Sequence, residues 1–460
     1  MENAFVNKPD INVLLRIDPA TLQKRLENFL PQEIAEMLAE THEAGQVMIF
    51  KALDREKAME VFELLDLPQQ NNLLTLLPHR LLLLILNDMS PDKRTELLEQ
   101  LDSDTLNRLL KLLSKRERSV ALNLLGYPES SVGRLMTPDY IAVHRDWSVQ
   151  HTLDFIRENG KDSETLDVIY IINEEGKLID DIHVREILIA PLSSPIEEIL
   201  DGKFVALSVM DDEESSIAVF RKHRRTALPV TDAAGLLIGI VTIDDVLQLA
   251  EDEDTEDIQK IGGVEALEFP YMQTTLQDMI KKRAGWLVIL FISEMFTATA
   301  MGYFQNEIEK AVVLALFVPL IISSGGNSGS QAATLIIRAM ALGEVTLRDW
   351  WHIMKKELIS GFILGGILGA IGFFRVSAWH FIQPKLYGVH WVQVALTVGI
   401  SLVGVVTWGS LMGSMLPLVI KRFGADPATS SAPFIATLVD VTGLVIYFSI
   451  AMMVMSGTLL

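Results

Sequence analysis

The sequence predicts a multidomain membrane protein: an all-α helical solenoid, an α/β repeat and an acidic connecting helix, followed by five transmembrane helices. Two observations carry this fold class, the charge distribution and five long apolar runs near the C-terminus. Residues 1–280 contain 52 Asp and Glu against 27 Lys and Arg, whereas residues 281–460 contain 8 against 12. Because so few charged side chains cannot cover a water-facing surface, we expect residues 281–460 to lie in lipid.

The five apolar runs predict membrane-spanning helices at about 284–304, 311–337, 358–380, 391–420 and 431–457. Lys and Arg cluster before the first span, between the second and third, and between the last two. The positive-inside rule therefore predicts a cell (inner) membrane protein with a cytoplasmic N-terminus and an extracytoplasmic C-terminus within a transmembrane domain of residues 281–460.

Composition narrows the range of partners. The net charge of -21 argues against nucleic acid and favours cations. The absence of cysteine excludes disulfides, thiolate metal sites and cysteine nucleophiles. Met1 to Arg16 mixes charged residues with no apolar core, so we expect no cleaved signal peptide and a cytoplasmic location for the acidic part.

Residues 1–127 are leucine-rich with helical spacing and recurring Pro and Ser breaks, which predicts a solenoid of short amphipathic helices. Residues 128–250 contain an internal repeat, at about 132–195 and 196–250. In each copy a strand is followed by an acidic turn with glycine, at Leu166–Gly176 and Thr226–Gly235.

This repeat resembles a tandem pair of CBS domains, a family that senses small ligands. In the second copy Gly239, Thr242 and Asp245 match the family's pattern, in which the hydroxyl and the carboxylate can bind a nucleotide. The first copy has Asp180, His183 and Glu186 at the corresponding places. Two interpretations stay open: ATP binding through Thr242 and Asp245, or a structural module that dimerises and transmits.

An acidic connecting helix is predicted at 251–280. Six carboxylates lie between Glu251 and Asp257, and on a helix Glu253, Glu256 and Asp257 share one face. Such a run is either a solvated surface or a site for Mg²⁺ or Ca²⁺, which prefer oxygen ligands. Further acidic candidates are the patch at 211–214 and the pair Asp88 and Asp92.

Glycines and amides interrupt the second apolar run at Gly325, Gly326, Asn327 and Gln331. Unwound backbone at membrane depth is tolerated only inside protein or along a watery cavity, so we expect this segment to lie near an ion pathway. Close helix packing is the alternative, and it fits Gly361, Gly365 and Gly369 of the third span better.

Asp440 is the clearest single candidate, because it lies about half a span from either end of the last helix. A carboxylate there is costly unless it is solvated, paired or bound to a cation. Mg²⁺ keeps most of its waters, so two Asp440 side chains across a two-fold axis would suffice, with the Ala436 carbonyl one turn earlier accepting from a bound water. For Glu294 in the first span we expect a packing or hydrogen-bonding role.

Motifs for zinc hydrolysis, serine nucleophiles and ATP-driven pumping are absent from the sequence, so we do not expect an enzyme. Taken together, several segments resemble the MgtE family of magnesium channels over essentially the whole chain: Gly126–Pro138, the CBS pair, Thr255–Gly262, Ser324–Gln331 and Ala436–Gly443.

The resemblance implies a homodimer whose cytoplasmic domains and plug helix regulate a pore. The pore ion would meet Asp440 and the Ala436 carbonyl, and acidic positions of the closed state would be Glu253, Glu256, Asp257, Asp245 and Asp426. Gln248 stands where a carboxylate would serve a cation better, so one regulatory site is expected to be weaker.

The predicted function is magnesium uptake by a channel that cytosolic Mg²⁺ closes. Mg²⁺ is then both substrate and regulator, with ATP as a candidate ligand of the CBS pair. Two alternatives remain: a CBS-regulated transporter that couples divalent cations to Na⁺ or H⁺, and a membrane-tethered nucleotide sensor. The residues leave selectivity among Mg²⁺, Mn²⁺, Co²⁺ and Ca²⁺ open.

Overall fold

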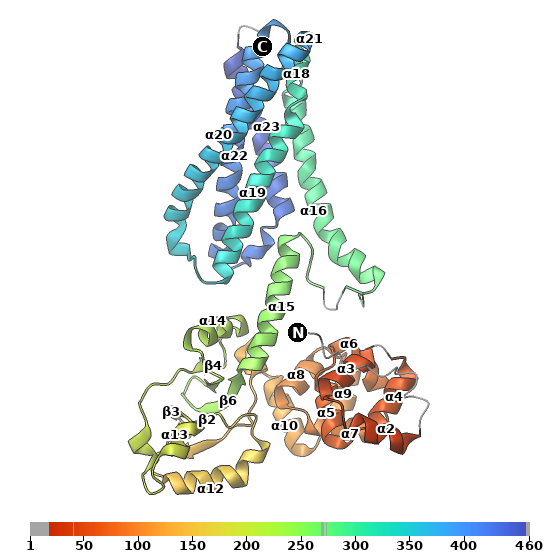
Figure 1. Ribbon diagram of the computed structural model, residues 1–460, viewed down its shortest axis with the longest axis vertical. Coiled ribbons are helices and arrows are strands. Elements are labelled where there is room, and N and C mark those ends of the chain that lie inside the picture. The colour runs from red at the N-terminus through yellow and green to blue at the C-terminus, as the bar shows by residue number, and fades with distance from the viewer. Residues whose placement is uncertain (1–17, 40, 268–270, 273, 457–460) are drawn as a thin grey trace, which may run out of the picture. The chain divides into compact units, whose positions relative to one another are not determined.

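The computed structural model describes residues 18–39, 41–267, 271–272 and 274–456 (Figure 1). Residues 1–17, where no signal peptide is expected, and residue 457 of the last predicted span lie outside the described residues. The chain divides into two compact units, Met1–Ala250 and Glu251–Leu460.

The first unit begins with short helices that enclose an apolar core in which Phe50 and Phe62 are fully buried. Asp18, Asp54 and Asp66 each accept a hydrogen bond from the free backbone N–H three residues later, which explains why helices restart at these points. The predicted all-helical domain is confirmed. Its helices, with the short one that follows, are α2 (Pro19–Leu26), α3 (Pro31–Ala39), α4 (Glu43–Ala52), α5 (Arg55–Glu63), α6 (Leu67–Leu76), α7 (His79–Asp88), α8 (Pro91–Glu99), α9 (Ser103–Leu110), α10 (Lys115–Leu124) and α11 (Val132–Leu135).

The internal repeat is also confirmed. Each copy forms a three-stranded sheet in which the first strand is parallel to the second and the second is antiparallel to the third. The first copy contains β1 (Ala142–His144), α12 (Val149–Asn159), η1 (Gly160–Asp162), β2 (Val168–Ile172), β3 (Leu178–His183) and α13 (Val184–Ile189). The second contains η2 (Ile196–Ile199), β4 (Leu207–Ser208), α14 (Glu213–His223), β5 (Ala227–Thr231), β6 (Leu237–Thr242) and α15 (Ile243–Ile261).

Long apolar helices dominate the second unit, and Figure 1 shows α19, α20 and α22 running side by side. Within the described residues, five helices are long and apolar enough to cross a membrane. The elements are α16 (Leu276–Tyr303), α17 (Gln305–Lys310), α18 (Val312–Ala315), α19 (Val318–Ala341), η3 (Leu347–Asp349), α20 (Trp350–Ile382), α21 (Pro384–Tyr387), η4 (Gly388–His390), α22 (Trp391–Arg422), η5 (Pro427–Thr429) and α23 (Ala432–Met455).

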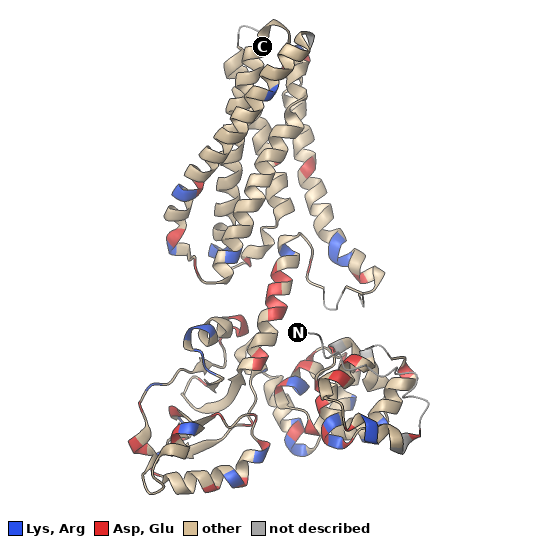
Figure 2. Ribbon diagram, viewed as in Figure 1, with Lys and Arg blue, Asp and Glu red and all other residues tan. Residues whose placement is uncertain are grey.

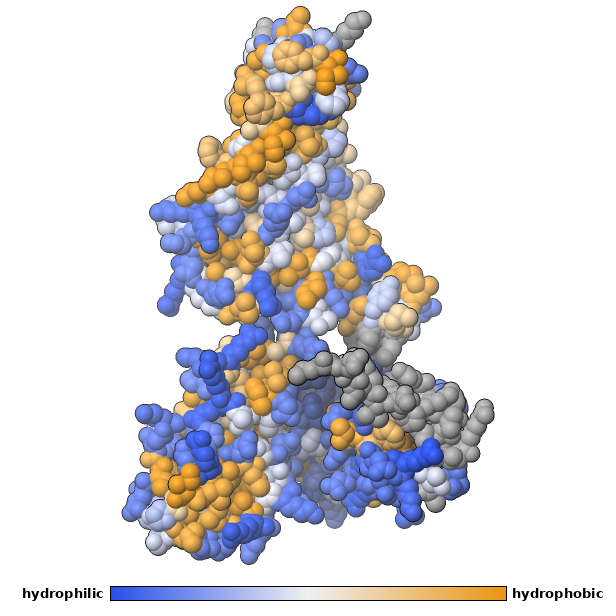
Figure 3. Space-filling model, viewed as in Figure 1, coloured by the Kyte–Doolittle hydropathy of each residue, from blue (hydrophilic) through white to orange (hydrophobic). Residues whose placement is uncertain are grey.

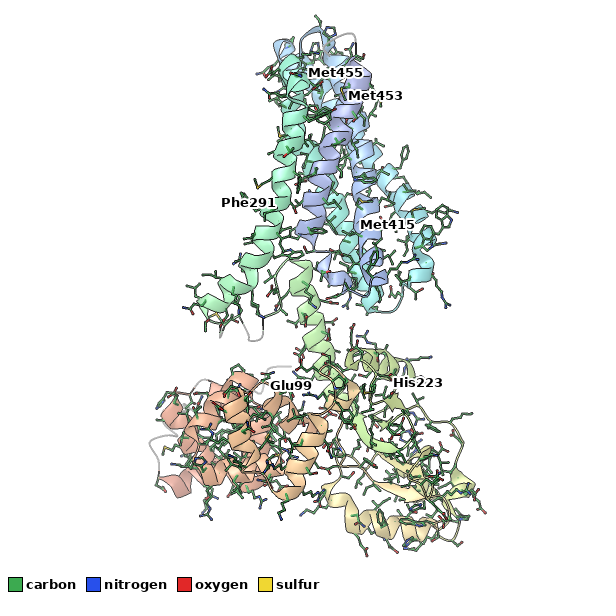
Figure 4. All side chains as sticks on the ribbon, turned by 180° about the vertical axis from the view of Figure 1, so that it is seen from behind. Glu99, His223, Phe291, Met415, Met453 and Met455 are labelled. Atoms are coloured by element: carbon green, nitrogen blue, oxygen red, sulfur yellow. The ribbon has the colours of Figure 1, made fainter. Side chains whose placement is uncertain are left out.

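The surface of the second unit matches a lipid environment. Large apolar side chains such as Phe291 and Phe362 are 71% and 65% exposed, and Phe291 points away from the neighbouring helices in Figure 4. Apolar residues cover much of the face seen in Figure 3. Lys and Arg gather near the ends of the long helices, as Figure 2 shows.

Two expectations about helix continuity are corrected. The predicted unwinding in the second span is wrong, because α19 is continuous through Gly325 and Gly326. The glycines of α19 are explained without unwinding, because they let the backbone of α22 approach closely. The connecting helix does not continue to residue 280: α15 ends at Ile261, and Gly263 follows with φ 75°, a conformation that favours glycine.

Candidate ion pathway and regulatory sites

Asp440 lies on α23, whose N-terminus is capped by Ser431. The Ser431 Oγ accepts a hydrogen bond from the Phe434 N–H at 3.3 Å, and Pro433 in the first turn has no N–H to satisfy. Ala436 and Asp440 are one turn apart, and both are partly exposed in the single chain. The α23 face that carries them is therefore not fully covered by the chain's own helices.

Gly326 brings α19 up to this face. A Cβ atom at Gly326 would lie 3.3 Å from the Ala436 Cβ and 3.7 Å from Asp440 Oδ1. The structure thus brings together three of the predicted pathway residues, Gly326, Ala436 and Asp440. Asn327 and Gln331 are exposed on the same helix.

Gly325 has a different surrounding. A Cβ there would lie 2.5 Å from Val405 Cγ1 of α22 and 2.8 Å from Val439 Cγ1 of α23. Gly325 therefore serves close packing, the alternative that sequence reasoning disfavoured for this segment. The packing predicted for the third span is confirmed: Gly361, Gly365 and Gly369 of α20 contact the backbone of α22.

Polar side chains fix α23 to its neighbours at several heights. The Trp408 indole N–H of α22 donates to Thr442 Oγ1 at 2.8 Å. The Tyr447 hydroxyl donates to the Leu314 carbonyl at 2.8 Å. At the start of the helix, the Trp286 indole N–H of α16 donates to Ser431 Oγ at 3.1 Å. These bonds hold the rotation of the helix that carries Asp440.

The packing or hydrogen-bonding role expected of Glu294 stays a prediction. Its side chain is exposed on α16, so the structure does not bury it against other helices of this chain.

Glu253, Glu256 and Asp257 all lie on the continuous helix α15, and a cation site on the face that they share stays a prediction. Glu253, Glu256 and Asp257 are partly buried on α15, whereas the other acidic residues of the run are exposed. Lys260 Nζ donates to Asp426 Oδ2 at 2.7 Å and also pairs with Glu256. The Asp254 carboxylate pairs with Arg338 of α19 at 3.0 Å. These ion pairs therefore tie the C-terminal part of α15, which belongs to the second unit, to α19 and to the connection between α22 and α23.

In the first unit, Asp88 and Asp92 do not form the expected pair. Asp88 instead accepts hydrogen bonds from the guanidinium of Arg55. Asp92 is only 7% exposed, and its Oδ1 has no hydrogen-bond partner among the residues that the structure describes. Burial, with the nearby charges of Asp245 and Glu164, raises the pKa of Asp92 well above its usual range.

Asp245 is the centre of this cluster. It is 6% exposed, accepts a hydrogen bond from Thr242 Oγ1 at 2.6 Å and pairs with Lys93 at 3.2 Å. Partial burial, Asp245 and Asp244 together raise the pKa of Glu164 to about 7. A divalent cation between such carboxyl groups would stabilise their ionised forms by relieving the repulsion between them.

In the first copy of the repeat, the residues that stand at the motif positions are bonded to residues of the second copy. Asp180 is fully buried and accepts a hydrogen bond from the Gly202 N–H at 2.9 Å. Arg225 pairs with Asp181 at 3.3 Å, and its other terminal nitrogen lies 3.4 Å from His183 Nε2. Only the second copy keeps the hydroxyl and carboxylate pair, at Thr242 and Asp245.

Among the described residues, no three Asp, Glu or His side chains are grouped closely enough to hold a metal ion directly. A hydrated Mg²⁺ needs only one or two carboxylates, so the pairs above fit it better than a fully dehydrated ion. Sequence reasoning missed Lys93, Glu164 and Lys260. Lys93 and Lys260 stand near acidic residues in the sequence, which indicates only an ordinary surface ion pair. Glu164 belongs to no motif.

Comparison with known proteins finds related domains along most of the chain. Residues 318–450 match the family model of the divalent cation transporter MgtE, residues 30–130 match the MgtE intracellular N domain, and residues 132–193 and 181–252 match CBS domains. The magnesium transporter MgtE of Thermus thermophilus is 37% identical over 342 residues, which is 74% of each chain. That of Enterococcus faecalis is 28% identical over 72% of this chain and 71% of its own.

Solved structures resemble about half of the chain. A crystal structure of the cytosolic domain of the Mg²⁺ channel MgtE in complex with ATP is 32% identical, has a TM-score of 0.50 and covers 52% of this chain and 97% of its own. A second structure, of the soluble part of a magnesium transporter, is 22% identical at a TM-score of 0.50, covers 53% of this chain and 97% of its own, and shows the fold alone.

Fold and matches together define a membrane protein in which a helical domain and a CBS pair precede a bundle of apolar helices. The chain belongs to the MgtE family.

Proposed function

We propose that this chain is a magnesium channel that mediates Mg²⁺ uptake across the cell membrane and closes when cytosolic Mg²⁺ is high. The observation that carries the proposal is the partly exposed Asp440 on α23, next to Gly326 and one turn from Ala436. A hydrated Mg²⁺ would meet the Asp440 carboxylate, while the Ala436 carbonyl would accept a hydrogen bond from one of its waters. Gly325 and Asn327 belong to the same α19 segment that frames this position.

The proposal includes a homodimer. The face of α23 with Ala436 and Asp440 is partly open in one chain, and a second copy would close it and supply a second Asp440. With the N-terminus in the cytoplasm, the acidic domains and α15 would face the cytosolic Mg²⁺ that regulates them. The predicted domain boundaries at 127 and 250 are part of this proposal, whereas the predicted boundary at 280 gives way to the start of α16 at Leu276.

Closure would come from Mg²⁺ that bridges carboxylates. In the first unit the candidates are Asp92 and Asp245, whose repulsion a cation would relieve; Asp88 is a weaker candidate because Arg55 already neutralises it. On α15 the candidates are Glu253, Glu256 and Asp257, with Asp426 from the segment before α23. Without Mg²⁺ these carboxylates repel and the closed arrangement loses stability.

The test is uptake by reconstituted protein. Asp440→Ala should abolish Mg²⁺ flux, and Asp440→Asn, which keeps the shape without the charge, should lose nearly as much. Normal Mg²⁺ flux in both variants would refute the pore assignment. Currents that need a counter-ion would instead favour the coupled transporter, and ATP binding without any flux would favour the nucleotide sensor.

A further inference from the structure

Lys260 occupies the position where a divalent cation would bridge α15 and the α22–α23 connection. Its Nζ donates to Asp426 Oδ2 at 2.7 Å and pairs with Glu256, one turn earlier on the same helix. All three side chains are between 27% and 39% exposed, so water and ions can reach them.

The other oxygen of Asp426 is already engaged. Oδ1 accepts a hydrogen bond from the Ala428 N–H at 2.8 Å and so caps η5. Oδ2 is therefore the oxygen that a cation would take, and the Lys260 ammonium holds it. Mg²⁺ can use the Glu256 and Asp426 pair only after the ammonium has moved away.

We infer that Lys260 is a built-in competitor for Mg²⁺ at Glu256 and Asp426, so that it sets how much Mg²⁺ closure requires. The inference rests on the proposed function, because it assumes that these two carboxylates bind regulatory Mg²⁺. A tethered ammonium has a high effective concentration at the site. At low Mg²⁺ it neutralises the pair, and at high Mg²⁺ the ion replaces it with a doubly charged bridge.

The opposing interpretation is that Lys260 only tethers the end of α15 to the α22–α23 connection. The two interpretations predict opposite signs. Without the competitor, Mg²⁺ should bind the pair more tightly and inhibit at lower concentration. Without a tether, closure should become harder and inhibition should need more Mg²⁺.

Arg338 provides a matched control. It forms another ion pair between α15 and the long helices, with Asp254 at 3.0 Å, and Asp254 is not among the proposed ligands. Arg338→Gln therefore removes a tether without freeing a carboxylate of the proposed site. Lys260→Arg is a second control, because a guanidinium keeps the charge and can bind the carboxylates in a bidentate manner.

The experiment measures the cytosolic Mg²⁺ concentration that half-inhibits flux through the full chain in liposomes. Lys260→Gln should lower this concentration about two- to fivefold, the range set by the strength of partly exposed ion pairs. Arg338→Gln should leave it unchanged or raise it, and Lys260→Arg should not lower it. An unchanged or raised value for Lys260→Gln overturns the inference.

Two further variants separate this inference from the proposed function. Glu256→Gln and Asp426→Asn should each raise the half-inhibiting Mg²⁺ concentration. If neither does, the carboxylates are not a regulatory site, and the proposed site and the inference fall together. If both do but Lys260→Gln does not lower the concentration, the site stands and only the competitor role is refuted.

Discussion

Gly325 and Gly326 are adjacent on α19 but have different surroundings, so they form a matched pair of substitutions. An added methyl at Gly325 would lie 2.5 Å from Val405 Cγ1, whereas one at Gly326 meets its nearest atom, the Ala436 Cβ, at 3.3 Å. Overpacking of this kind costs roughly 1–3 kcal/mol. Gly325→Ala should therefore lower the thermal unfolding midpoint more than Gly326→Ala does.

Mg²⁺ flux per folded molecule should show the opposite order, with the larger loss in Gly326→Ala. The methyl at Gly326 narrows the space beside Asp440 Oδ1, 3.7 Å away, so Gly326→Ala should lower Mg²⁺ flux even where the fold is retained. Scanning calorimetry in detergent and uptake normalised to folded protein would check both outcomes. Equal stability of the two variants would contradict the packing role assigned to Gly325.

Glu213 predicts a pH dependence of the first unit. At the start of α14, burial and the charges of Asp212 and Glu99 raise its pKa to about 7 from an ordinary 4.5, while the Ser130 side chain opposes the shift. Glu99, labelled in Figure 4, is itself paired with Arg134 at 3.0 Å. Between pH 4.5 and about 7 the folded unit holds a proton that the unfolded chain has lost.

The stability contributed by this protonated carboxyl is complete below pH 4.5 and is lost as pH rises through about 7. Glu213→Gln should therefore reduce the fall in thermal unfolding midpoint between pH 5 and pH 8, the two conditions of the assay. Glu197→Gln, at an exposed glutamate of the same unit, is the control and should leave the fall unchanged. An unaltered slope in Glu213→Gln would show that Glu213 is ionised in the folded unit.

At the scale of elements, the turn that follows α15 lies against both α16 and the start of α23, because a Cβ at Gly263 would lie 3.2 Å from Pro433 Cγ. A Cβ at Gly263 would lie 2.8 Å from Trp286 Nε1, and Trp286 donates to Ser431, the cap of α23. Movement of α15 therefore reaches the helix that carries Asp440 through a direct contact. Trp408 also donates to α23, but at Thr442, beyond Asp440.

These two tryptophans give a pair of equivalent substitutions. Trp286→Phe removes the hydrogen bond nearest α15 and should weaken inhibition by Mg²⁺ more than it changes flux at low Mg²⁺. Trp408→Phe removes the bond near Asp440 and should mainly change flux at low Mg²⁺. Dose–response curves of flux against cytosolic Mg²⁺ would separate the effects, and the reverse pattern would contradict the coupling through Gly263.

Elements whose pattern is local were predictable from sequence. Apolar runs fixed the membrane helices, and the repeat fixed the two small sheets, because periodicity and composition report burial directly. The continuity of α19 was not predictable, because a glycine-rich segment reads the same whether it unwinds or packs tightly against α22. Likewise, helical spacing predicted which face of α15 carries Glu256. The ion pair of Lys260 with Asp426 was not predictable, because the two residues are far apart in the chain.

At the scale of the whole molecule, the partly open face of α23 predicts a second copy. The chain has no cysteine, so a single introduced cysteine reports cross-linking without background. Asn327 is exposed on α19, on the segment beside the pathway, whereas Ile363 is 56% exposed on α20. If two chains meet around Asp440, Asn327→Cys should form a covalent dimer on mild oxidation in native membranes.

Ile363→Cys reports random collision, because lipid would cover that position under the proposed arrangement. A disulfide needs Cα atoms within about 7 Å, so its formation at Asn327 would place the two α19 helices next to each other. Added Mg²⁺ should change the rate of cross-linking at Asn327 if closure moves these helices. Equal cross-linking of both variants, or none at Asn327, would argue that the pore is not formed between two copies in this way.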